Sequence, residues 1–99
     1  MKKARSFFHY LPKAQAFLSN RIDEGTNYHP SVEVFEYMVG RNPKIGDIIA
    51  KWQPATIRRF PVIVPKCKDL SFYYWFAEKG RSLFINVVLI CFVEDEKIK

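Results

Sequence analysis

The chain is predicted to fold as one α+β domain over residues 1–99. We expect an N-terminal strand, an antiparallel two-helix hairpin and a three-stranded antiparallel meander that completes a curved sheet. The 99 residues are 48% hydrophobic and 16% aromatic, which supplies enough apolar side chains for one core. Apolar residues recur at helical spacing in the first half, while β-branched and aromatic runs fill the second. Helices and strands separated along the chain in this way are typical of the α+β class.

The first segment predicts a strand and then a helix. Residues 4–10 are rich in strand formers and are interpreted as a strand, or as the lead-in to the helix. Pro12 can open the helix, because proline is tolerated in a first turn. A turn is expected at residues 23–27, which contain Gly25. The apolar face of this helix would be Ala14, Phe17, Leu18 and Ile22.

A second helix is expected to begin at Pro30 or Ser31 and to end at Gly40. Glu33 would place negative charge near the positive end of this helix. The following Asn42-Pro43 pair cannot easily continue a helix. Its apolar stripe would be Val32, Phe35, Tyr37, Met38 and Val39.

Three strands should follow, at residues 56–64, 70–76 and 83–92. The link at residues 77–82 contains Glu78, Lys79 and Gly80 and predicts a hairpin turn. Pro61 cannot donate a ladder hydrogen bond, so it should lie at an edge, a bulge or the end of pairing.

The charge balance indicates the kind of partner. A net charge of +6 favours nucleic acid or an acidic protein segment, although a merely solvated basic surface would give the same balance. The apolar run at residues 83–93 is too short to span a bilayer, and the N-terminus does not resemble a signal peptide. We therefore expect a cytoplasmic protein without a membrane partner, in which Cys67 and Cys91 are reduced.

No pattern in the sequence predicts a cofactor or a metal. Its glycines are isolated, and no histidines or cysteines lie at zinc-ligand spacing. Arg58 and Arg59 should point to opposite faces of a strand, where one could pair with a carboxylate or phosphate. The aromatic run 72–76 should place side chains on both faces of its strand, with one set exposed or covered by a partner.

Several short motifs, taken together, carry a family resemblance. They are Leu11-Pro12-Lys13-Ala14, Asn42-Pro43-Lys44-Ile45-Gly46, Ile57-Arg58-Arg59-Phe60-Pro61-Val62 and the Phe72-Tyr73 pair. In this order and spacing the chain resembles the RelE/ParE superfamily of type II toxins, and in particular its ParE-like branch. The likeness extends from Ala4 to about Leu89.

The resemblance implies a function and a set of partners. ParE-like proteins inhibit DNA gyrase by binding, and an antitoxin neutralises them within a toxin–antitoxin hetero-oligomer. On this interpretation the chain is a toxin without cofactor or metal, and a short acidic antitoxin gene should adjoin its own. The residues expected to contact partners are Arg58, Arg59, Phe60, Trp75 and Phe92.

Two alternatives remain open at this level. RelE-like proteins resemble ribosome-dependent mRNA endonucleases, and here the candidate catalytic residues would be Arg58, Arg59, Tyr73 and Arg81. The chain departs from the ParE-like pattern at Tyr74 and Asn86, where arginines are usual, and at residues 90–92, where a histidine motif is usual. A decayed toxin that only binds its antitoxin is the other alternative.

Overall fold

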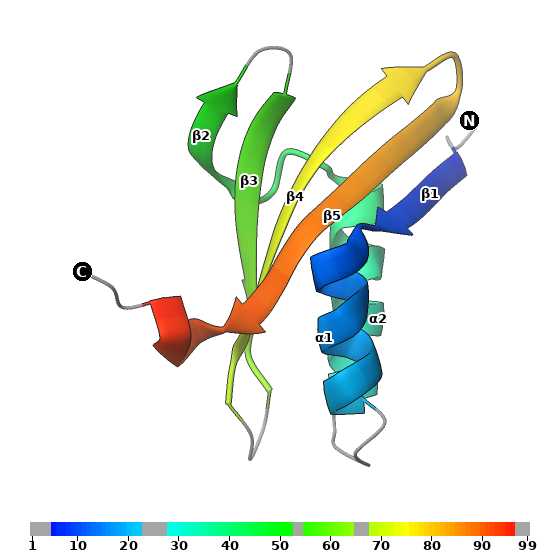
Figure 1. The fold of residues 1–99 in the computed structure, drawn as a ribbon. Coiled ribbons are helices and arrows are strands. Elements are labelled where there is room, and N and C mark those ends of the chain that lie inside the picture. The colour runs from blue at the N-terminus through cyan, green and yellow to red at the C-terminus, as the bar shows by residue number, and fades with distance from the viewer. Residues whose placement is uncertain (1–4, 23–27, 53–54, 65–67, 97–99) are drawn as a thin grey trace.

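The order of the elements confirms the α+β class. The computed structural model describes residues 5–22, 28–52, 55–64 and 68–96. A strand precedes two helices, and four strands follow them (Figure 1). The elements are β1 (Arg5–Tyr10), α1 (Pro12–Ile22), α2 (Tyr28–Arg41), β2 (Asp47–Trp52), β3 (Ala55–Val62), β4 (Leu70–Lys79), β5 (Ser82–Phe92) and a short 3-10 helix, η1 (Val93–Glu96).

The five strands form one mixed sheet in the order β1-β5-β4-β3-β2. The three strands predicted as a meander, β3 to β5, are antiparallel neighbours. β2 adds a further antiparallel strand beside β3, and β1 pairs in parallel with β5 at the opposite edge. The last two strands form the predicted hairpin, but the link predicted at residues 77–82 is reduced to a turn at residues 80–81, because the strands extend to Lys79 and from Ser82. This turn contains Gly80 at φ +60°.

The strand β2 is absent from the sequence-based prediction. It is an edge strand, and a bulge between Ile48 and Ala50 interrupts its pairing with β3. The bulge removes the alternation of buried and exposed residues by which a strand is usually recognised. As a result, the consecutive residues Ile48 and Ile49 are both about half exposed, at 47% and 49%.

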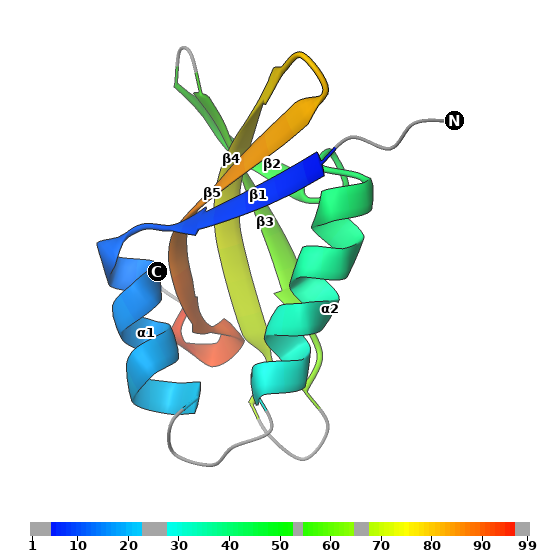
Figure 2. The ribbon, with the colours of Figure 1, turned by 90° about the vertical axis from the view of Figure 1, so that its right-hand side faces the viewer.

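Both helices cover the same face of the sheet and run in opposite directions (Figure 2). α1 packs mainly on β5, and α2 packs on β3. The η1 segment lies on the other side of the sheet, which we call the outer face (Figures 1 and 2). Beneath the helices, the Phe35 ring stacks on the Phe72 ring with 4.1 Å between centroids.

The core contains residues from both helices and from the three central strands, together with Val64, which follows β3. Burial of these apolar side chains is the main favourable contribution to folding. Its buried members are Ala14, Phe35, Val39, Val62, Val64, Leu70, Phe72, Tyr74, Leu83, Ile85, Val87 and Ile90.

The first helix follows the prediction, whereas the second differs from it at both ends. In α1, Ala14 is buried and Phe17 and Leu18 are partly buried. α2 begins at Tyr28, two residues early, so Glu33 is not in its first turn. The helix also continues through Gly40 to Arg41.

The predicted apolar stripe of α2 is wrong at two positions, Tyr37 and Met38, and the Met38 side chain is 37% exposed. The side chain of Tyr37 is 61% exposed, because it follows the buried Phe35 by two residues and so points away from the sheet. The predicted turn at residues 23–27 and Cys67 lie outside the described residues. Within the residues that the structure describes, no helix has the length and apolar character to cross a membrane.

Candidate partner-binding site

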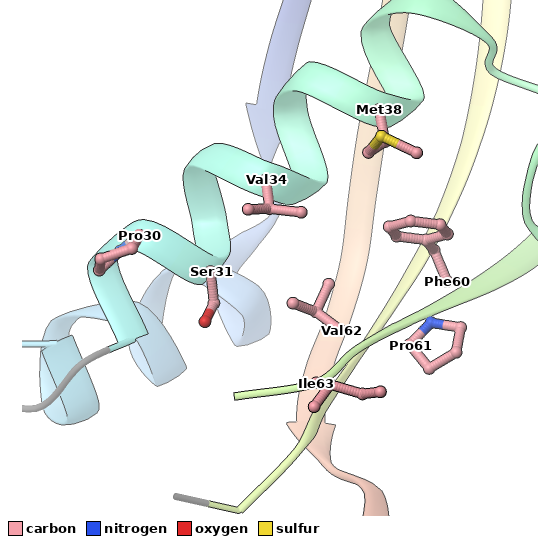
Figure 3. A pocket seen from close by; sticks show the side chains of 8 residues that line it. All are labelled: Pro30, Ser31, Val34, Met38, Phe60, Pro61, Val62 and Ile63. Carbon is pink, nitrogen blue, oxygen red and sulfur yellow. The ribbon is translucent and has the colours of Figure 1, made fainter. Parts of the chain in front are cut away.

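An apolar groove of about 500 Å³ lies between α2 and the C-terminal part of β3. Figure 3 shows the side chains of α2 facing those of β3 and of the residue that follows it. The lining residues are Pro30, Ser31, Val34, Met38, Phe60, Pro61, Val62 and Ile63. A groove of this size and composition is suited to apolar side chains from a partner.

The groove exists because β2 is shorter than β3. Pairing between the two strands ends at Asp47 and Arg59, so from Phe60 to Val62 β3 pairs with β4 alone. Pro61 therefore lies beside an unoccupied edge, which is one of the positions predicted for it. Because proline has no N–H to offer, it also discourages another strand from pairing at this edge.

The walls of the groove expose apolar side chains to solvent. Val34 and Met38, one helical turn apart on α2, are 47% and 37% exposed. On the opposite wall, Ile63 is 78% exposed, whereas Val62 is buried at the base. An exposed apolar surface with a concave shape is characteristic of a protein-interaction site.

The loop between α2 and β2 is held by Tyr74 and Arg58. The Tyr74 hydroxyl donates to the Pro43 carbonyl at 2.7 Å and accepts from the Gly46 N–H at 3.0 Å. The Arg58 guanidinium donates to the carbonyls of Lys44 at 3.1 Å and Gly46 at 2.9 Å. Arg58 thus stabilises a loop on the helix side of the sheet.

Close packing around Gly46 explains why this position has no side chain. A Cβ atom there would lie 2.7 Å from the Tyr74 hydroxyl oxygen and 2.9 Å from the Arg59 carbonyl oxygen. Burial raises the pKa of Tyr74, outweighing the opposing effects of the Gly46 N–H and the nearby Arg58 charge. The phenol therefore remains protonated and acts as a structural hydrogen-bonding group.

The structure separates the two neighbouring arginines, as the sequence predicts. Arg58 lies opposite the buried Tyr74, and Arg59 lies opposite Tyr73 on the outer face. Tyr73 is itself opposite Leu89 of β5. Arg59 and Tyr73 are thus neighbours on the outer face, whereas the Arg58 side chain lies on the helix side of the sheet.

The remaining predicted site residues are dispersed. Phe60 lines the groove, and its ring centroid lies 6.2 Å from that of Phe35. Trp75 is on the outer face, two residues from Tyr73. Phe92 packs edge-on against Phe17 at 5.3 Å, and Arg81 is in the exposed β4–β5 turn.

Sequence reasoning missed most of the groove. Val34 and Met38 lie four residues apart, but Met38 was assigned to the buried stripe and Val34 to no site. Their partial exposure depends on where the pairing of β2 with β3 stops, at Asp47 and Arg59, which is a long-range property of the sheet. Pro61 was the available signal, because an edge was one of the three positions predicted for it, beside a bulge and the end of pairing.

A second polar contact joins β1 to α2. The Tyr10 hydroxyl donates a 2.6 Å hydrogen bond to the Glu36 carboxylate. Burial raises the pKa of Tyr10 strongly, and the hydrogen bond to Glu36 and its negative charge raise it further. This contact attaches the edge strand to the helix that forms one wall of the groove.

Among the described residues, no group of three or more His, Cys, Asp or Glu side chains is arranged to hold a metal ion. The chain matches no protein-family model, no curated protein and no solved structure. The functional assignment therefore depends on the groove, the charge and the motifs.

Proposed function

We propose that this chain is a ParE-like toxin of a type II toxin–antitoxin system, with the corresponding RelE/ParE-like fold. It would inhibit DNA gyrase by binding and would be neutralised by an antitoxin that occupies the groove between α2 and β3. The open apolar groove is the observation that carries this proposal. It offers a partner protein a preformed concave surface on an otherwise packed face.

The spatial arrangement of the family-like motifs supports the proposal. The carbonyls of Lys44 and Gly46, in one motif, accept hydrogen bonds from the Arg58 guanidinium of another motif. Residues from two separate motifs thus hold the loop between α2 and β2. A shared requirement for this loop gives a physical reason for these motifs to occur together.

The expected antitoxin has two chemical properties. An acidic segment would be attracted to the net charge of +6, which speeds association. An apolar stretch, most simply one face of a helix, would place side chains between Val34, Met38 and Ile63. A helix suits the site better than an added strand, because Pro61 cannot donate a hydrogen bond at the open edge.

A charge placed in the groove tests this assignment. Met38→Glu should weaken antitoxin binding at least about tenfold, because a carboxylate would lose its hydration there. The binding partner is the product of the adjoining acidic reading frame, and affinity is measured by calorimetry. In bacterial cells, the variant should arrest growth even when this partner is co-expressed.

The matched control is Tyr37→Glu, on the same helix but outside the groove. This control should bind the antitoxin like the unmodified protein. Equal affinities for all three proteins would remove the groove from the proposal. Equal loss in both variants would point to the added negative charge as the cause.

A second candidate function is ribosome-dependent mRNA cleavage. It is favoured by the placement of Arg59 opposite Tyr73 on the outer face, where a phosphate could meet a cation and a phenol. Mapping transcript ends after adding the protein to translating ribosomes tests it. Codon-linked cuts that disappear in Tyr73→Phe would favour the nuclease. Antitoxin binding with neither activity would indicate a decayed toxin.

A further inference from the structure

A second exposed surface lies at the far end of the sheet, where β1 meets the β4–β5 hairpin. We call it the basic aromatic patch, and it consists of Arg5, Phe7, Lys79, Arg81 and Phe84. All five side chains are exposed. We propose that this patch binds an unpaired nucleic-acid strand, with the rings stacking on bases and the cations contacting phosphates.

The two phenylalanines form one aromatic platform. Phe7 of β1 is directly opposite Phe84 of β5, and their rings stack with centroids 5.4 Å apart and planes inclined by 18°. They are 43% and 37% exposed, respectively. The ring faces that do not stack on each other could accept any base, because every base has a π-face.

Three cationic residues surround this platform. Arg5 and Lys79 both lie opposite Ser82, from the strands on either side of it. The Arg5 N–H donates to the Arg81 carbonyl at 3.1 Å, which brings the turn next to β1. The Arg5 guanidinium carbon also lies 5.6 Å from the centre of the Phe7 ring. Positive charge is therefore concentrated within two or three residues of the rings along the strands.

The acidic side chain at this end of the hairpin lies on the opposite face of the sheet from the patch. Glu78 is the acidic residue of the segment 76–86. It lies opposite the buried Leu83, so its side chain leaves the sheet on the helix side, whereas its neighbour Lys79 points to the outer face. The outer face of this corner consequently combines aromatic rings with cations.

This combination favours nucleic acid over an acidic peptide. Carboxylates could satisfy the cations but would leave the stacked rings exposed, whereas a single strand supplies phosphates and flat bases together. The bases must be unpaired, because those in a duplex already stack on each other. The groove lies on the helix side of the sheet, so this inference does not rest on the proposed function.

The test measures the anisotropy of fluorescent oligothymidylate and oligouridylate strands of about twelve nucleotides. Phe7→Leu/Phe84→Leu keeps the apolar bulk but removes the rings, and should weaken binding about fivefold or more. Arg5→Gln/Arg81→Gln should reduce the slope of log affinity against log salt by about 1.4, for two lost phosphate contacts. The two oligonucleotides distinguish DNA from RNA as the ligand.

Matched controls remove the same groups from other surfaces. Lys13→Gln/Lys51→Gln has the same net charge as the arginine variant, and Tyr37→Leu removes an exposed ring from α2. The lysine control should keep the salt slope of the unmodified protein, and the Tyr37→Leu control should keep its affinity. The proposal is overturned if the controls lose as much as the patch variants, or if a duplex or a polyglutamate peptide binds as tightly as the single strands. Circular dichroism identifies any variant that fails to fold, and Phe84→Tyr, which keeps a stacking ring, should then bind normally.

Discussion

At the scale of single residues, Tyr74 links β4 to the loop between α2 and β2. Its hydroxyl donates to one backbone group and accepts from another, within the buried core. Tyr74→Phe would leave the buried Gly46 N–H without its partner, so we expect a loss of about 2 kcal/mol in unfolding free energy. Urea denaturation measures this loss. The exposed Tyr37→Phe variant should change stability little, and equal stability of all three proteins would contradict the role given to Tyr74.

Tyr10 should make the free energy of unfolding fall with rising pH in the alkaline range. Its pKa is raised in the folded chain, so the folded state retains a proton that the unfolded chain releases above about pH 10. The stabilisation is complete below that pH and is lost as pH rises toward the folded pKa. Tyr10→Phe should lower stability by about 1 kcal/mol at pH 8 and should reduce the further fall between pH 8 and 11. Urea titrations at both pH values test this, and an unchanged pH dependence would exclude Tyr10 as the source.

At the scale of elements, the β4–β5 hairpin turns at Gly80. Its φ of +60° is unfavourable for side chains, although a Cβ atom at this position would have no neighbour within 4 Å. The cost of Gly80→Ala is therefore one of backbone conformation, about 1 kcal/mol. Gly80→Asn should cost less, because asparagine adopts this conformation more readily. Thermal unfolding of both variants measures the difference, and equal losses would indicate that the cost has another origin.

The same hairpin shows what local sequence can predict. Gly80 between two β-branched and aromatic runs specified the turn, and the pairing of β4 with β5 followed from it. The alternation of Phe72 and Tyr74 with Tyr73 and Trp75 also predicted two faces without indicating which was buried. Contact between Phe35 and Phe72 decides this, and it joins elements that are distant in sequence.

At the scale of the whole molecule, the sequence predicted the layers better than the site. Apolar periodicity is a local signal, so strand, helices and meander could be predicted from it. The groove depends instead on the bulged, edge-lying β2, which begins only at Asp47, opposite Arg59, and on α2 lying across the exposed part of β3. The basic aromatic patch likewise requires the parallel pairing of β1 with β5, which brings Phe7 to Phe84. Both surfaces arise from long-range pairing that no single segment specifies.

The two surfaces also lie on opposite sides of the sheet. The groove is on the helix side and has apolar walls, while the patch is on the outer face and carries positive charge. This separation allows one partner to occupy the groove while the other face stays accessible. A toxin whose antitoxin binds in the groove could therefore be controlled without direct competition at the outer face.

The decisive measurement is DNA supercoiling by purified gyrase in the presence of increasing amounts of this protein. A ParE-like toxin should reduce supercoiling in proportion to its concentration, and the proposed acidic antitoxin should restore activity. Met38→Glu should still inhibit the enzyme but should no longer respond to that partner. Undiminished supercoiling at a large molar excess of correctly folded protein would contradict gyrase inhibition as its function.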